Sequence, residues 1–402
     1  YQFESGGVVS PVGRTRTAPA LGAHPERLRF ALASCQDWSN GHYAAYRHMA
    51  RQDLDLVLHV GDYIYEGLIG NDNARDRIVP LEVRLEPIAL EEYRLRYALY
   101  KTDPSLQAAH AAAPFVVTWD DHEVANNYAN DLDQRNSDPA EFLKRRAAAY
   151  QAYYEHTPLR RAQMPRGANA QLYRRLTYGD LAQFSVLDTR QYRSHPAHGG
   201  ALVAPRDAEV KDPSRVLMGA RQEAWLQNGL RSSQARWKVV PQQIWMTQFV
   251  VPSIKGPTVT MDYWDGYPAE RDRLMRFLHE AKVKNAVVLS GASHRNLVSE
   301  LKLDFDKADS PSVGVELAGT AISSSGVEPK DEPLWEKLVS IQPHLKWFEG
   351  VKRGYVTCIL DRKEFHADFW AVQNLKDPKS AVTRSAAFVI EDGRPKVSRA
   401  TS

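Results

Sequence analysis

Short apolar runs that end abruptly in polar residues recur along the chain. They cover residues 28–34, 54–60, 115–119, 184–187, 237–240 and 287–290. Each run is aliphatic and β-branched and is shorter than an ordinary helix, so each predicts a strand of a sheet with both faces covered. In open α/β sheets, ligands bind beyond the carboxyl ends of the strands. The polar residues that follow these runs are therefore expected to gather at one edge of the sheets.

Helical patterns separate the predicted strands. They occupy residues 41–52, 90–98, 139–156, 218–231 and 269–281. Asp138 precedes the longest of them and is expected to cap it. Glycine- and proline-rich segments predict surface loops at 194–212, 255–267 and 308–312. Apolar and polar residues alternate over 354–397, which predicts antiparallel strands at the end of an α/β fold.

Composition is that of a folded protein. The chain has 402 residues, 43% of them hydrophobic and 25% charged, which allows a large core and argues against disorder. A formal net charge of +3 gives no reason to expect nucleic acid as a partner. No apolar run approaches the ~20 residues of a membrane span. The chain begins at Tyr1 rather than Met, which suggests a processed product.

The ends of the first two runs carry metal-ligand chemistry. Gly61-Asp62-x-x-Tyr65 follows the second run, and Cys35 follows the first. A carboxylate can bridge two metal ions, and a phenolate at neutral pH needs a strong Lewis acid such as ferric iron. A thiolate beside Asp62 would add a soft ligand. Two alternatives remain open, namely that Tyr65 packs as an ordinary aromatic residue and that Cys35 is a small buried hydrophobe.

A third cluster follows the run at 115–119. Asp120, Asp121, His122 and Glu123 are adjacent, and such a group is costly to bury without cations. Metal or substrate contact is therefore expected. Asn127 can supply a neutral amide oxygen to a hard ion such as calcium.

Two later strand ends carry isolated candidates. Arg190 lies in Asp188-Thr189-Arg190 and can pair with a phosphate oxygen or, as readily, form a salt bridge with Asp188 or another carboxylate. His294 is a candidate metal ligand or transition-state contact.

Together these segments resemble the alkaline phosphatase D (PhoD-like) family of metallophosphoesterases. The matching stretches span most of the chain and comprise residues 34–36, 58–66, 118–128, 187–193 and 264–268. Within that family the chain also resembles the secreted actinobacterial phospholipase D branch that lacks the usual HKD motifs.

The resemblance implies a four-layer αββα sandwich with an iron site, joined in some members by Ca²⁺. Cys35, Asp62 and Tyr65 would bind Fe³⁺, with Asp62 bridging to a second metal. Asp121 stands where the wider superfamily has a metal-binding Asn, and Asn127 is a further candidate ligand of the second metal. His122 would lie near the phosphate.

The resemblance also implies a domain organisation. Family members usually begin with an immunoglobulin-like domain, so residues 1–25 are expected to be a linker from such a domain and 26–402 to form the catalytic domain. Secretion to the extracellular space is likewise expected from the family.

One position departs from the family pattern. The family has Gly-Asp-x-His near its last catalytic strand, whereas this chain has Gly291-Ala292-Ser293-His294. Ala292 removes the oxygen donor and the negative charge of a ligand Asp. Our hypothesis is a deliberate inactivating substitution, with a natural loss as the alternative, and impaired turnover is expected.

The function expected from the sequence is hydrolysis of phosphodiesters, phospholipase D-like or of the alkaline phosphodiesterase or phosphatase type. A metal-bound hydroxide would attack phosphorus, and His122 or His294 would assist. A phospholipid substrate would bring peripheral membrane contact. Two rivals remain open: a non-catalytic phosphate- or metal-binding protein on the same scaffold, and a metal hydrolase of carboxylic esters.

Overall fold

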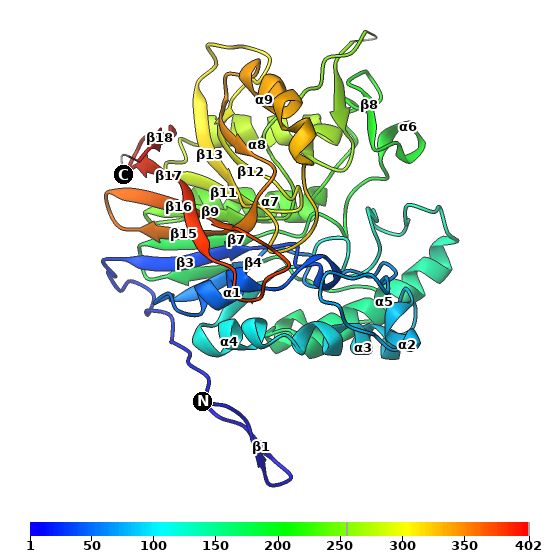
Figure 1. Ribbon diagram of the computed structural model, residues 1–402. Coiled ribbons are helices and arrows are strands. Elements are labelled where there is room, and N and C mark those ends of the chain that lie inside the picture. Colours follow the sequence, from blue (N-terminus) through cyan, green and yellow to red (C-terminus); the bar gives the residue numbers. More distant parts are fainter. Residues whose placement is uncertain (255, 401–402) are drawn as a thin grey trace.

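Two seven-stranded sheets pack face to face at the centre of the molecule (Figure 1). The computed structural model describes residues 1–254 and 256–400. In the first sheet, parallel strands β3 (Leu28–Ala33), β4 (Leu56–His59) and β5 (Phe115–Val117) lie at one side. The antiparallel strands β15 (Arg353–Leu360), β16 (Glu364–Val372), β17 (Val382–Glu391) and β18 (Ser398–Arg399) extend it from β3. The predicted antiparallel strands near the end of the chain are therefore present.

The second sheet also has a parallel centre and antiparallel edges. Its parallel strands are β7 (Ala182–Val186), β9 (Trp237–Pro241), β11 (Ala286–Ser290) and β13 (Ser312–Ala318). The antiparallel strands are β6 (Arg174–Tyr178), β12 (Asn296–Lys302) and β14 (Leu345–Glu349). The carboxyl ends of the parallel strands bring distant segments of the chain to one edge of each sheet.

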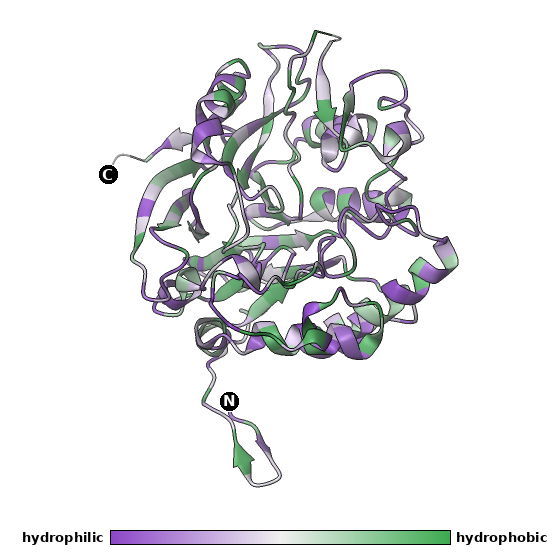
Figure 2. Ribbon diagram, turned by 45° about the vertical axis from the view of Figure 1, so that its right-hand side comes forward, coloured by the Kyte–Doolittle hydropathy of each residue, from purple (hydrophilic) through white to green (hydrophobic). Residues whose placement is uncertain are grey.

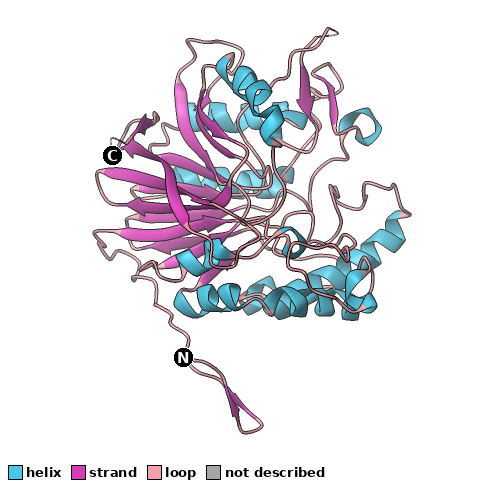
Figure 3. Ribbon diagram, viewed as in Figure 1, coloured by secondary structure: helices cyan, strands magenta, loops and turns pink. Residues whose placement is uncertain are grey.

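Helices form the two outer layers (Figures 1 and 3). The first sheet is covered by α1 (Ala44–Met49), α2 (Leu81–Arg84), α3 (Leu90–Lys101), α4 (Pro104–Ala112) and α5 (Pro139–His156). The second is covered by α7 (Gly219–Ser232), α8 (Pro268–Glu280) and α9 (Glu332–Ser340). Asp138 caps α5 as expected, because its carboxylate accepts the N–H groups of Ala140 and Glu141. This arrangement confirms the predicted αββα sandwich.

The packing follows from the alternation of side chains along each strand. In β3, Phe30 and Leu32 enter the core between the two sheets, whereas Ala31 and Ala33 face the helices. The Phe30 ring meets the ring of Phe184 on β7 edge-to-face, with centroids 5.5 Å apart. Large residues therefore join the sheets, and small residues let the helices approach. Figure 2 shows the resulting mixture of apolar and polar positions along the elements.

Several elements depart from the sequence expectations. The first helix begins only at Ala44, and the predicted loops around 194–212 and 255–267 contain the short helix α6 (Ala197–Gly200) and paired strands β8 (Val203–Pro205) and β10 (Thr258–Thr260). Lys255, which opens the second of these loops, lies outside the described residues. Strands β12 and β13 escaped prediction because they bury polar side chains, such as Ser299 and Glu316, among apolar ones. Glu316 is tolerated there because it accepts the backbone N–H groups of Met246 and Thr247.

The first residues stand apart from this sandwich. Strands β1 (Glu4–Ser5) and β2 (Val8–Val9) form a small exposed hairpin away from the sheets (Figure 1). The assignment of residues 1–25 to a linker stays a prediction. None of the helices among the described residues has the length and apolarity that crossing a membrane requires.

Candidate active site

The predicted site residues come together beyond the carboxyl ends of the parallel strands. Cys35 follows β3, Asp62 follows β4, and Ala292 and His294 follow β11. All four have left-handed backbone conformations, with φ between 54° and 59°. Such conformations are unfavourable for residues other than glycine and cluster at functional sites, where the surrounding structure holds them in place. The tight turns after these strands therefore bring the side chains of Cys35, Asp62 and His294 together.

Cys35, Asp62, Tyr65 and His294 form the first group. The Cys35 thiol donates to Asp62 Oδ2 at 3.3 Å, and the Tyr65 hydroxyl donates to the same oxygen at 3.1 Å. The Tyr65 oxygen lies 3.0 Å from His294 Nε2. Potential ligand atoms of Cys35, Asp62 and His294 all lie within 4.8 Å of one another. His294, expected as a catalytic residue or ligand, thus joins the three predicted iron ligands.

The polar atoms of this group suit a cation. Asp62 is buried, and its Oδ1 has no hydrogen-bond partner among the described residues. Burial raises the pKa of Asp62, of the Cys35 thiol and of the Tyr65 phenol well above their ordinary values. An ion would replace those protons and neutralise the buried charge. Thiolate, imidazole and phenolate are transition-metal ligands, so this donor set fits iron.

His294 is oriented for such a role. Its Nδ1 lies 2.5 Å from the carbonyl oxygen of Ser325, so Nδ1 carries the proton and Nε2 keeps its lone pair toward Asp62 and Tyr65. Burial lowers the pKa of His294 to about 3, which keeps the ring neutral.

A second group lies beside the first and shares Asp62 with it. Potential ligand atoms of Asp62, Asp121 and His122 lie within 4.8 Å of one another. The backbone N–H of Asn127 donates to Asp121 Oδ2 at 2.7 Å. The Asn127 side chain makes no hydrogen bond among the described residues, so its amide oxygen is available to a ligand. Asp62 is therefore the residue common to two groups that could each hold a cation.

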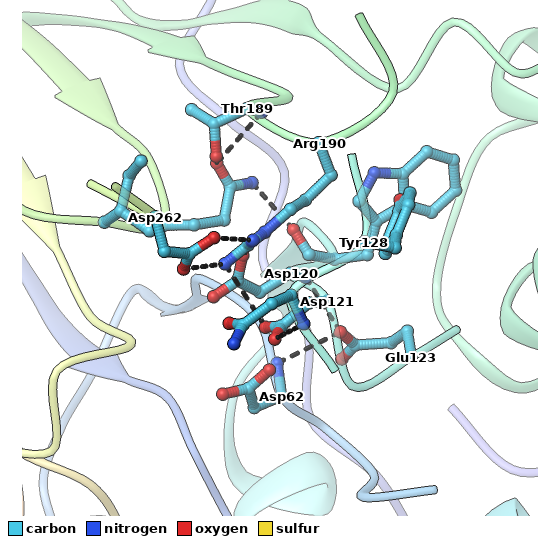
Figure 4. A network of polar contacts seen from close by, with 12 residues as sticks. Asp62, Asp120, Asp121, Glu123, Tyr128, Thr189, Arg190 and Asp262 are labelled. Carbon is cyan, nitrogen blue, oxygen red and sulfur yellow. Dashed lines mark hydrogen bonds and ion pairs between the residues drawn. The ribbon is translucent and has the colours of Figure 1, made fainter. Parts of the chain in front are cut away.

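Arg190 lies in a network of carboxylates behind the second group (Figure 4). Its Nε donates to Asp120 at 2.5 Å, and its two Nη atoms donate to Asp262 at 2.5 and 2.9 Å. Asp121 Oδ1 lies 3.3 Å from Nη2. The side chain is only 1% exposed. The salt bridge left open by the sequence is thus present, with partners other than Asp188, whereas a phosphate contact of Arg190 stays a prediction.

This network sets the charge of Asp121. Burial alone would raise the pKa of Asp121, but the positive charges of Arg190 and His122 lower it below its ordinary value. Asp121 is therefore ionised and held in place, as a ligand for a hard cation must be. Asp262 was not predicted, because it reaches the site through its pairing with Arg190, which lies 72 residues earlier in the chain.

Glu123 holds the backbone of the site in place. It is fully buried, and its carboxylate accepts the backbone N–H groups of Asp62, Tyr63 and Asp120, at 3.1, 2.5 and 2.8 Å. One side chain thus ties the turn after β4 to the turn after β5 (Figure 4). The sequence placed Glu123 in the acidic cluster but gave no sign of this positioning role.

His122 faces the open side of the site with a buried partner behind it. Its Nδ1 lies 2.6 Å from Oε2 of Glu66, whose other oxygen accepts the Asn126 N–H at 2.6 Å. Burial lowers the pKa of His122, but the charges of Glu66, Asp121 and Asp62 outweigh it and raise the pKa well above its ordinary value. The imidazole is therefore protonated, and Nε2–H is free to donate.

A cavity of about 310 Å³ opens beside this ring. Its lining includes Tyr65, Glu66, Leu68 and His122. It offers space for a substrate next to both ligand groups.

Ala292 provides no donor atom to the site, although its place in the chain lies close to the ligands. A Cβ on the preceding Gly291 would stand 2.5 Å from Ser34 Oγ and 3.0 Å from a methyl group of Val60. Gly291 therefore lies close to the strand ends that carry Cys35 and Asp62, and position 292 is the next residue in the chain.

The apolar and aromatic side chains of the segment 261–267 belong mainly to the core. Met261, Trp264 and Tyr267 are buried almost completely among other side chains.

The fold and the ligand groups define an αββα sandwich of the phosphoesterase class. The family model of the PhoD-like phosphatases matches residues 30–369, and the chain belongs to the PhoD-like phosphatase family. The prediction of a phosphoric ester hydrolase of this family is thereby confirmed.

Individual relatives agree with this assignment. The chain is 44% identical over 404 residues to alkaline phosphatase D of Bacillus subtilis (strain 168), covering 100% of this chain and 69% of that protein. A solved structure of PhoD superposes with a TM-score of 0.93 at 42% identity, covering 100% of this chain and 76% of the other. The roles of the individual site residues stay predictions.

Proposed function

We propose that the chain hydrolyses phosphodiesters at a site that holds Fe³⁺ and a second cation, Ca²⁺. The observation that carries the proposal is the shared position of Asp62 between the two ligand groups. Cys35, Asp62, Tyr65 and His294 would hold the iron, and Asp62, Asp121 and Asn127 the calcium. Two cations held by these residues would supply positive charge for the phosphate oxygens and would activate a nucleophile for in-line displacement.

The remaining chemistry falls to His122. Its protonated ring beside the open cavity suits two tasks, namely binding a phosphate oxygen and donating a proton to the departing alkoxide. Glu66 holds the ring through Nδ1, so that Nε2–H points away from the buried side. Arg190 acts through Asp121, which it orients and keeps ionised.

A phospholipid is the second candidate substrate, favoured by apolar residues near the cavity. Leu68, which lines the cavity, is 66% exposed. Further exposed aliphatic side chains in the same segment are Ile78, Leu81, Leu85 and Ile88. Such a surface favours an amphiphilic leaving group and peripheral contact with a lipid surface. We also propose that the protein is secreted, on the strength of the family resemblance.

A substrate screen tests the reaction class. Bis(p-nitrophenyl) phosphate, p-nitrophenyl phosphate and p-nitrophenyl acetate are offered with iron and calcium supplied, and again after metal removal. We expect the diester to be turned over fastest, only with metal, and slowly in this chain because of Ala292. Preferential hydrolysis of the acetate would favour a carboxylic ester hydrolase. Metal binding without any turnover, also after the substitution at position 292 described below, would favour a binding protein.

Replacing Glu66 with Gln tests the assignment of His122. In a background with measurable activity, Glu66→Gln is expected to lower kcat by about 10- to 100-fold with little change in KM. The pKa of His122 should fall once the carboxylate is gone. As the pH is raised, the activity of the variant should therefore begin to fall at a lower pH than that of the parent. Glu66→Asp should keep the charge and restore part of the rate. A basic limb that does not move would contradict the proton-donor role.

A further inference from the structure

A second cavity, of about 810 Å³, lies at the same end of the second sheet as the active site. It is bounded by residues around 161–173, by Gln191 and Tyr192, and by the start of α7. Residues 161–173 precede β6, which runs antiparallel to β7, so they lie beside the carboxyl end of β7. The segment after β7 separates the two sites, because Arg190 faces the carboxylates of the active site while its neighbours Gln191 and Tyr192 line the cavity.

The charged side chains that line this cavity are all positive. Arg161, Arg166 and Arg221 line it, and no Asp or Glu is among the described residues of its lining. Within the described part of the chain, no carboxylate forms an ion pair with any of the three, whereas Arg190 is surrounded by carboxylates. All three side chains are exposed to solvent. Three arginines that line one cavity without acidic partners favour binding of an anion.

Two further groups offer hydrogen-bond donors. Helix α7 begins at the cavity, and its N-cap residue Met218 makes no side-chain cap, so the N–H groups of its first turn are unsatisfied within the helix. Tyr173 is only 4% exposed, lines the cavity, and has a hydroxyl group without a hydrogen-bond partner among the described residues. Tyr173 and the first turn of α7 line the same cavity as the three arginines.

We propose that this arginine-lined cavity is a second anion site that binds a phosphate group other than the one being hydrolysed. The fork of a guanidinium and the N–H groups at a helix start both match phosphate oxygens. The phosphate has two possible sources, a further phosphate of the substrate or released inorganic phosphate. The first source rests on the proposed function, because it makes substrates with more than one phosphate the preferred ones.

Direct binding tests the site without any turnover. Inorganic phosphate is titrated by calorimetry, at fixed ionic strength, into protein freed of metal on a chelating resin. We expect saturable binding that Arg166→Gln/Arg221→Gln weakens at least about tenfold and Arg161→Gln about fivefold. Arg160→Gln is the matched control, since Arg160 is the exposed neighbour of Arg161 outside the lining and should bind like the parent. Absent binding, or equal weakening by the control, would overturn the proposal.

Kinetics then distinguish the two sources. Bis(p-nitrophenyl) phosphate carries one phosphate, and a p-nitrophenyl phosphodiester of glycerol phosphate carries two. If the substrate supplies the ligand, Arg166→Gln/Arg221→Gln raises KM about tenfold for the two-phosphate substrate alone. An unchanged KM for both would overturn that source and assign the site to free phosphate. Failure to hydrolyse either substrate would count against the proposed function, while the binding result would stand by itself.

Discussion

The substitution Ala292→Asp is expected to raise kcat/KM for bis(p-nitrophenyl) phosphate by about 100-fold. Substitutions at metal sites change activity by about this factor. Gly291 lies close to Ser34 and Val60, so position 292 is the next residue after a contact with the strand ends that carry Cys35 and Asp62. The family pattern has a ligand Asp at this position. An Asp there adds an oxygen donor and a negative charge where two cations are proposed. Metal affinity should increase with the rate.

The backbone at this position gives the experiment an internal control. Ala292 has a φ of 54°, a left-handed conformation that costs an alanine about 1 kcal/mol and that Asp and Gly adopt more readily. Ala292→Gly should therefore stabilise the protein without changing turnover, whereas Ala292→Asp should raise both stability in metal and activity. Equal rates for the parent and Ala292→Asp at saturating metal would show that the position is no disabled ligand.

The parallel strands β3, β4 and β5 were predictable because they are apolar on both faces. The runs ending at Ser34, Val60 and Trp119 stand out in the sequence, and β3, β4 and β5 lie within them. The β12–β13 pair was not predictable by the same rule. Its buried polar residues are satisfied by partners distant in the chain, as Glu316 is by Met246 and Thr247, and only the folded structure brings these together.

The residues of the active site also differ in whether the sequence predicts them. Cys35, Asp62 and Asp121 were predictable because each lies shortly after the carboxyl end of a strand, where side chains converge. The supporting residues were not. Asp262 reaches the site by pairing with Arg190, 72 residues earlier in the chain. Glu123 acts through three backbone N–H groups, and neither kind of contact leaves a local pattern in the sequence.

Asp62→Asn is expected to remove both metal sites at once, because Asp62 is the residue common to the two ligand groups. In the Ala292→Asp background, turnover should fall on the order of 10³-fold, equivalent to the several kcal/mol of charge stabilisation that bound metal supplies. Iron and calcium measured by elemental analysis should both decrease. The visible charge-transfer band of phenolate-bound iron should disappear. Asp309→Asn, a change at an exposed carboxylate, is the matched control and should alter none of these.

Stability should respond to Asp62→Asn in opposite directions with and without metal. In metal-free protein the carboxylate is buried, and its Oδ1 lacks a partner among the described residues, so the neutral amide should stabilise the fold by about 1 kcal/mol. With metal at 100 times its Kd, the parent gains about 2.7 kcal/mol that the variant cannot gain. The thermal midpoint of the variant should therefore lie above that of the parent after metal removal and below it in metal. A variant that is less stable under both conditions would show that Asp62 is a structural acceptor for Cys35 and Tyr65 rather than a ligand held ready for a cation.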